Sequence, residues 1–259
     1  MTVVRGKESA PGPVDRCVTE TFTLPETSTA EPLPGGPYDL EFFLDPMCPF
    51  AWQTSVWVRR VAELRSLRIG WRFISLQLLN TELAHAEVSA ERRSIYLAGT
   101  RVLRLAAAAR EAGGNEAAGS IYEQWGTGLW NTERNGRDFG KVRNEFLDGA
   151  DLGAFLEKAG LSRDLVSTAD DERYDDVIRA ETLLALDRAG TELGTPIITF
   201  DAANDGKSFF GPVISTALSD DDALKLYDAI VTLTQLGSFS ELKSSKRPPF
   251  DLPLLANRV

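Results

Sequence analysis

A chain of 259 residues, of which 43% are hydrophobic and 25% charged, is long enough to bury a sizeable core without disulfide support. Its formal net charge of −10 repels phosphate backbones and anionic lipid surfaces, which argues against nucleic-acid and membrane partners. No window approaches the roughly 20 apolar residues of a membrane span, and the first residues lack the apolar centre of a signal peptide. We therefore expect a cytoplasmic protein.

The supply of catalytic and ligating side chains is small. The chain has two cysteines, Cys17 and Cys48, and one histidine, His85. This set argues against a zinc site, and no nucleophile-elbow motif accompanies His85 to build a serine-histidine triad. A disulfide between the two cysteines would be unusual in a reducing cytosol. We expect no metal, and no flavin, because no glycine-rich phosphate-binding motif is present.

Residues 1–36 predict a flexible N-terminal extension. Few aliphatic residues are available there to build a core, and Cys17–Leu24 alone alternates polar and apolar residues as a short strand would. The prolines of this segment are Pro11, Pro13, Pro25, Pro32 and Pro34.

A strand-helix-strand unit follows the extension. The apolar run Tyr38–Leu44 predicts a buried strand, and the apolar spacing within Phe50–Leu64 predicts a helix. Alternation over Leu67–Leu76 predicts a second strand. Such a unit within about 40 residues is typical of two parallel strands joined by a crossover helix.

From Asn80 to about Gly190 the strand signal is absent and only helices are predicted. The long helix Ser89–Ala112 is rich in alanine, leucine and arginine and is ended by glycines. Three further helices are expected at Ala117–Leu129, Asp151–Ala159 and Asp171–Ala189.

Strands return near the C-terminus. Pro196–Phe200 and Ser208–Phe210 predict an antiparallel hairpin, and Ser219–Leu236 predicts an amphipathic helix with an acidic N-terminus. The order βαβ, helices, ββα predicts an α/β thioredoxin-like fold with an all-helical domain inserted between its two halves. We assign residues 37–78 and 191–245 to the thioredoxin-like domain, 79–190 to the inserted domain and 246–259 to a C-terminal tail.

Cys48 lies where the first strand turns into the first helix. At a helix N-terminus, unpaired backbone N–H groups and the macrodipole stabilise an anion. We therefore expect the pKa of Cys48 to lie below the value of about 8.5 for a free cysteine, and the thiolate to be a nucleophile.

The segment around this cysteine, Asp45-Pro46-Met47-Cys48-Pro49-Phe50-Ala51-Trp52, resembles the active-site stretch of the DsbA/FrnE-like thioredoxin superfamily. In particular, the chain is similar to the actinobacterial mycothiol-dependent nitroreductase group over about residues 38–245. Three later segments agree with that group in order and rough spacing: Gly194-Thr195-Pro196, Phe209-Phe210-Gly211-Pro212 and Glu241-Leu242-Lys243.

The resemblance implies a thiol-binding site around Cys48. By this resemblance Thr195-Pro196 is a cis-proline element that faces the cysteine and leaves the backbone of Thr195 free to pair with a thiol. It also implies mycothiol as the low-molecular-weight thiol, with glutathione as its equivalent elsewhere. We expect Pro49, Phe50, Ala51 and Trp52 to line this site.

Trp130 is a further candidate for thiol or substrate binding. Trp125 and Trp130 flank a glycine-rich turn, an arrangement that suits a flat ligand. The group that the chain resembles carries a histidine where Trp130 or Asn131 stands here.

Ala51 occupies the position at which dithiol members of the superfamily carry a second cysteine. Cys48 therefore cannot form the internal disulfide of that motif and cannot cycle as a thioredoxin does. It can form a mixed disulfide with a small thiol, which a second thiol molecule, or Cys17, would resolve. The sequence thus predicts a monothiol oxidoreductase that reduces a small electrophilic or nitroaromatic substrate.

Two other functions remain open. The chain is also similar in organisation to the kappa-class glutathione transferases and the 2-hydroxychromene-2-carboxylate isomerases, in which a bound thiol does the chemistry. The third possibility is a binding protein that lost redox turnover with its second cysteine. The sequence leaves open whether the protein is a monomer or a homodimer.

Overall fold

The central strand of the protein, β1 (Leu40–Leu44), is buried along its whole length. The computed structural model describes residues 30–83, 87–191, 193–244, 246 and 248–256. Within them β1 pairs in parallel with β2 (Ile69–Phe73) and antiparallel with β3 (Ile197–Phe200), which pairs with β4 (Ser208–Phe210). The sheet order is β2-β1-β3-β4, as in a thioredoxin-like fold, and it confirms the predicted parallel pair and hairpin. The segment Cys17–Leu24 and His85 lie outside the described residues.

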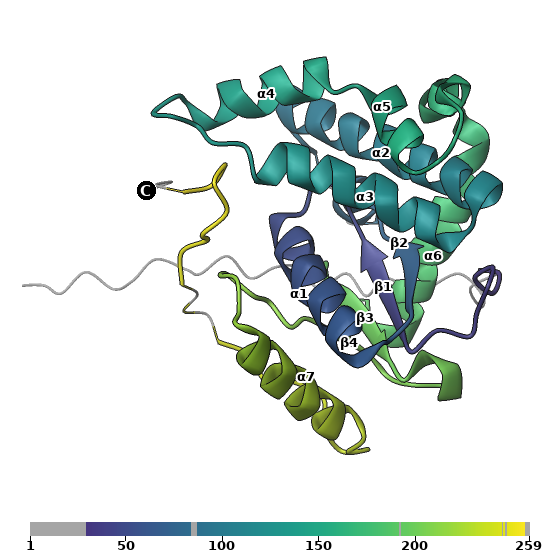
Figure 1. Ribbon diagram of the computed structural model, residues 1–259, viewed down its shortest axis with the longest axis vertical. Helices are drawn as coiled ribbons and strands as arrows, with labels where there is room; N and C mark the ends of the chain where they lie inside the picture. Colours follow the sequence, from purple (N-terminus) through teal and green to yellow (C-terminus); the bar gives the residue numbers. More distant parts are fainter. Residues whose placement is uncertain (1–29, 84–86, 192, 245, 247, 257–259) are drawn as a thin grey trace, which may run out of the picture.

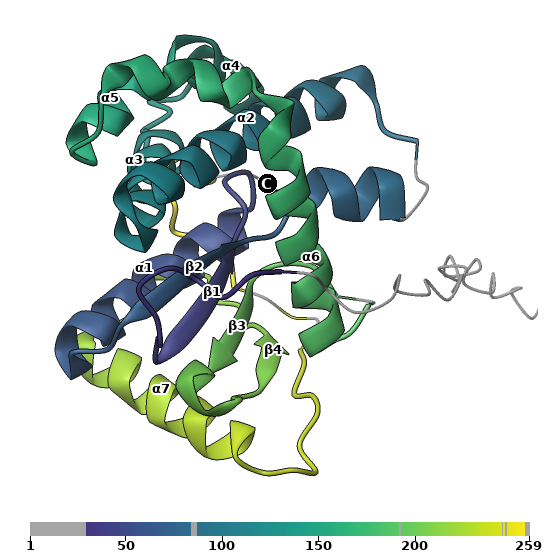
Figure 2. The same ribbon diagram turned by 90° about the vertical axis from the view of Figure 1, so that its right-hand side faces the viewer.

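The two faces of β1 contribute to different cores. Leu40, Phe42 and Leu44 join the main hydrophobic cluster with helices α1 (Pro49–Arg65) and α7 (Asp220–Thr234). Phe43 packs on the other face, in a small cluster that includes Ala185 of α6 (Asp175–Ala189). Figures 1 and 2 show α1 and α7 on one face of the sheet and α6 on the opposite face.

The segment between β2 and β3 is helical, as predicted, among the residues that the structure describes. Besides α6 it holds four α-helices, which lie together beyond one end of the sheet in Figure 1: α2 (Ala90–Gly113), α3 (Asn115–Trp130), α4 (Phe139–Gly149) and α5 (Leu152–Lys158). Helical turns of the 3₁₀ or π type occur at Leu78–Leu83, Arg163–Asp170, Glu172–Tyr174 and, after β3, Ala202–Asn204.

Two helices differ from the prediction. Helix α4 was not expected, although the side chain of Asp138 caps it by accepting a hydrogen bond from the N–H of Lys141. Helix α6 starts at Asp175 and not at Asp171, because a 3₁₀ turn precedes it. In that turn the hydroxyl of Tyr174 donates to Glu111 of α2, which fixes the chain before the helix begins.

Residues 30–38, at the end of the predicted extension, lie against the sheet. Leu33 is buried, the Tyr38 hydroxyl donates to the carbonyl of Pro34, and Arg72 of β2 donates to the carbonyl of Glu31. No helix in the described part of the chain is long and apolar enough to cross a bilayer.

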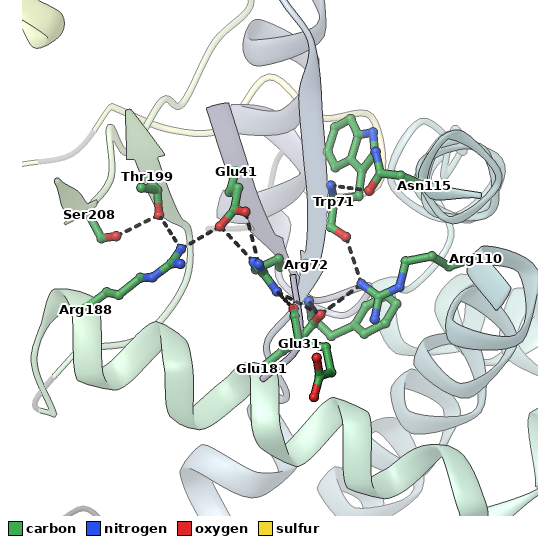
Figure 3. A network of polar contacts seen from close by, with 11 residues as sticks. Glu31, Glu41, Trp71, Arg72, Arg110, Asn115, Glu181, Arg188, Thr199 and Ser208 are labelled. Carbon is green, nitrogen blue, oxygen red and sulfur yellow. Dashed lines mark hydrogen bonds and ion pairs between the residues drawn. The ribbon is translucent and has the colours of Figure 1, made fainter. Parts of the chain in front are cut away.

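Side chains from the helices cap the outer edge of β2. The side-chain oxygen of Asn115 accepts from the N–H of Trp71, and its nitrogen donates to the carbonyl of Ile69, both at 2.8 Å. Arg110 donates to the carbonyl of Trp71, and Glu181 accepts from the N–H of Phe73. Figure 3 shows the contacts of Asn115 and Arg110 with Trp71. These bonds replace the missing neighbour strand and close the edge against pairing with another chain.

We predict that Asn115→Ala destabilises the protein by about 2 to 4 kcal/mol, because it leaves a buried N–H and a buried carbonyl of β2 without partners. Urea unfolding followed by circular dichroism measures the change. Asn204→Ala is the matched control, since Asn204 is exposed and bonds only to Asp201 among the described residues. Equal stability of the two variants would contradict the assigned role of Asn115.

Candidate active site

Cys48 is the N-cap residue of α1. Asp45 and Pro46 end β1 in a turn, and Pro49 occupies the first helical position, where the missing N–H of proline costs nothing. The sulfur of Cys48 accepts a hydrogen bond from the N–H of Ala51 at a distance of 3.4 Å. The thiol is therefore fixed at the helix start, as the sequence predicted.

The thiol also contacts the other half of the fold. The Thr195–Pro196 peptide bond is cis, and the Cys48 thiol donates to the carbonyl of Thr195 at 3.6 Å, across 147 residues of sequence. Antiparallel pairing of β1 with β3 brings these segments together. The Thr195 hydroxyl is buried and has no hydrogen-bond partner among the residues that the structure describes.

Burial decides the protonation state of this thiol. Cys48 is only 6% exposed, and its burial raises the pKa to about 12. The N–H groups of Ala51 and Phe50 lower this pKa, as expected at a helix start, but their effect is smaller than that of burial. The charge of Asp45 raises it further. The prediction of a lowered pKa is therefore wrong for this arrangement, in which Cys48 is a neutral thiol.

Asp45 is a buried carboxylate at the same turn. Its two oxygens accept from the N–H groups of Met47 and Leu76, at 2.7 and 2.8 Å. Burial raises the pKa of Asp45 to about 6, although these hydrogen bonds and one from Cys48 lower it. No arginine or lysine of the described residues forms an ion pair with Asp45, so its charge remains uncompensated.

Three tryptophans pack behind the turn. The indole N–H groups of Trp125 and Trp130 both donate to the carbonyl of Pro46, at 3.1 and 3.3 Å. The indole of Trp52 donates to Asn131 and packs over Gly126, where an added Cβ would lie 2.0 Å from the ring. Trp130 is 3% exposed, so here it holds the Pro46 turn from behind.

The C-terminal segment covers the start of α1. The ring of Phe250 packs at a tilt of 53° against that of Phe50, with centroids 4.6 Å apart. The N–H of Leu254 donates to the carbonyl of Trp130, and Leu252 and Leu254 are buried. This cover could not be foreseen from a segment interpreted as a tail.

The structure brings most of the predicted site residues together around Cys48, whose sulfur is hydrogen-bonded to the N–H of Ala51 and to the carbonyl of Thr195. Pro49, Phe50, Ala51 and Trp52 form the first turn of α1, and the carbonyl of Thr195, next to Pro196, accepts from the thiol. Ala51 is fully buried, and Cys48 is a free thiol. Cys17 lies outside the described residues, and within those residues no group of three or more histidine, cysteine or acidic side chains is placed to hold a metal ion.

We predict that Asp45 makes stability depend on pH. Its folded pKa of about 6 lies above the ordinary 3.8, so the proton it retains stabilises the folded state at low pH, and this stabilisation is lost as the pH rises through 6. Relative to Asp45→Asn, the wild type should lose about 2 to 3 kcal/mol between pH 4 and pH 7 in urea unfolding. The control Asp148→Asn keeps Asp45 and changes only an exposed acid, so it should lose stability in parallel with the wild type. A constant difference between wild type and Asp45→Asn would contradict the prediction.

Comparison with known proteins identifies a family for the chain. Residues 47–244 match the family model described as "Rv2466c-like: Mycothiol-dependent nitroreductase Rv2466c", a range that includes Cys48, the helical segment and Thr195-Pro196. The chain is also similar to the uncharacterized protein Rv2286c of Mycobacterium tuberculosis (strain ATCC 25618 / H37Rv), at 28% identity over 221 residues, which cover 85% of this chain and 87% of the relative. The chain belongs to the Rv2466c-like family.

Proposed function

We propose that the protein is a monothiol oxidoreductase that uses mycothiol, or a related low-molecular-weight thiol, to reduce a small electrophilic or nitroaromatic substrate. The observation that carries this proposal is the contact of the Cys48 thiol with the carbonyl of Thr195, in a site where Ala51 stands in place of a second cysteine. The name of the family supports the thiol and the class of reaction.

Thr195 offers the groups that a thiol co-substrate needs. Its carbonyl already lies 3.6 Å from the Cys48 sulfur, and its buried hydroxyl is unpaired among the described residues. An unpaired buried hydroxyl is costly, and a polar group of an incoming thiol would satisfy it. The residue therefore fits the role of holding a thiol against Cys48.

The chemistry balances with two thiol molecules per cycle. In the first step the Cys48 thiol and one thiol molecule each lose a proton and an electron, and a disulfide bond forms between them. The two electrons and two protons convert a nitro group to a nitroso group and water. A second thiol molecule then attacks the mixed disulfide, releases Cys48 and leaves as the small-molecule disulfide.

Cys48 must lose its proton to react, because the thiolate is the attacking species. The buried arrangement described above is thus the resting form, and we propose that an incoming substrate opens a cover formed by the groups that are packed around Cys48. Water then reaches the sulfur, and the N–H groups of Ala51 and Phe50 stabilise the thiolate.

The raised pKa favours a second candidate, a transferase or isomerase in which a bound thiol does the chemistry. A neutral Cys48 is a hydrogen-bond donor and could orient that thiol without forming a bond to it. Serine at position 48 would keep the donor and lose the sulfur, which separates the two candidates.

We predict that the reduced protein gains the mass of one mycothiol on incubation with oxidised mycothiol, because Cys48 attacks the disulfide and retains half of it. Intact-protein mass spectrometry measures the adduct, and peptide mapping places it at Cys48. Cys17→Ser is the matched control and should still form the adduct, whereas Cys48→Ser should not.

Reduction of a nitroaromatic compound by mycothiol, assayed with the same variants, distinguishes the alternatives. The proposal expects turnover by wild type and Cys17→Ser, and background rates for Cys48→Ser. Undiminished turnover by Cys48→Ser would contradict the monothiol mechanism and support the mechanism in which a bound thiol does the chemistry. If the wild type forms no adduct and shows no turnover, both enzyme mechanisms fail and the third possibility, a binding protein, is supported.

A further inference from the structure

A network of ionised side chains lies on the α6 face of the sheet, away from Cys48. Glu41 of β1 accepts from Arg72 and Arg188, at 2.7 and 2.5 Å, and Glu181 pairs with Arg72 and Arg110, at 3.1 and 3.0 Å. Figure 3 shows that the five side chains come from both strands and helices. Their direct contacts join three guanidinium groups to two carboxylates, which leaves one excess positive charge in a chain of net charge −10.

The network is separate from the thiol site. Glu41 stands opposite Thr199 in the β1–β3 register, whereas the residue of this chain segment that contacts Cys48 is Thr195. Four residues of extended chain span about 13 Å. Any ligand of the network would therefore bind independently of Cys48.

Arg188 is the member of the network with hydrogen-bond donors to spare. Its Nη1 donates to Glu41 and Thr199, whereas its Nε and Nη2 have no hydrogen-bond partner within the described ranges. Its side chain is one-third exposed (33%), in contrast to 3% for Arg72. Burial would raise the pKa of Glu41, but the hydrogen bonds from Arg72 and Arg188 outweigh it and hold the pKa below its ordinary value. Glu41 is therefore ionised and already satisfied by these arginines.

Two cavities meet at Arg188. The larger, of about 490 Å³, lies between residues 30–38 and the Ala202-Ala203 turn, and its wall combines polar and apolar groups, with Glu41, Arg72 and Arg188 as its charged residues. The smaller, of about 300 Å³, is lined by Thr199, Ser208, Lys207 and Asp205 besides Arg188. A cavity of this size with a few converging polar groups is ordinary for a small-molecule site.

We propose that the larger cavity binds a small organic carboxylate. The carboxylate accepts from the free Nε and Nη2 of Arg188, since a guanidinium offers two parallel donors that match a carboxylate. The apolar body of the ligand lies against Pro32, Pro37 and Ala203, which are the exposed apolar residues of the wall. A single negative charge balances the excess charge of the network, whereas the double charge of a phosphate would exceed it next to Glu41. This binding site goes beyond the proposed thiol chemistry.

Isothermal titration calorimetry of the full chain with benzoate tests the proposal. We expect saturable binding of one benzoate per chain. Benzamide, which has the same ring without the charge, and inorganic phosphate should bind at least about tenfold more weakly, because each lacks one of the two features that the cavity matches. Absence of saturable benzoate binding, or equal binding of benzamide or phosphate, would overturn the proposal.

Variants locate the binding site. Arg188→Gln should weaken benzoate binding at least about tenfold, whereas Arg137→Gln, a matched loss of an exposed ion-paired arginine, should not. Cys48→Ser should bind benzoate normally, since the two sites are separate. If Arg188→Gln does not fold, Ala203→Phe tests the site instead. Its ring fills the cavity from an exposed position and leaves every ion pair intact, so it should also weaken benzoate binding. Undiminished binding by Ala203→Phe, or by a folded Arg188→Gln, would overturn the proposal.

Discussion

The complete burial of β1 is the constraint on which the rest of the structure depends. All five residues of the strand are buried, between β2 and β3 along its edges and between helices on its faces. The side chains of Glu41, Asp45 and Cys48 are consequently removed from water and need partners within the protein. Near one end Glu41 accepts hydrogen bonds from two arginines. At the other end Asp45 accepts only from backbone N–H groups, and the Cys48 thiol donates to the carbonyl of Thr195.

This constraint sets the chemistry of the proposed site. A helix N-terminus favours a thiolate, but here burial removes the sulfur from water, and the backbone N–H groups at the helix start do not offset that loss. The resting protein therefore holds a protected thiol, and we infer that reactivity arises when a substrate opens the cover. Such an arrangement suits an enzyme with one cysteine, because an exposed thiolate with no resolving partner would be open to oxidation.

The fold was largely predictable from the sequence because its signals are local. One short segment holds three such signals: the apolar run before Cys48, the helical spacing after it and the alternation around Trp71. Each predicted element formed within a few residues of its predicted bounds. The helix Phe139–Gly149 escaped prediction although its sequence carried the signal: Asp138 marks its start, and its apolar residues follow at helical spacing, at positions 139, 142, 146 and 147.

The environment of the site was not predictable in the same way. The groups that bury Cys48 and its turn come from Trp125, Trp130 and Thr195, which are distant in sequence, so no local pattern could show that burial outweighs the helix start. The acidity of the Cys48 thiol is therefore the most direct test of the account. Alkylation by iodoacetamide, followed at Cys48 by peptide mapping, should be slow at pH 7 and accelerate about tenfold per pH unit up to pH 10, as the thiolate fraction rises. A rate that levels off near pH 7 would contradict the account, because it would mean that the helix N-terminus sets the pKa of the resting thiol.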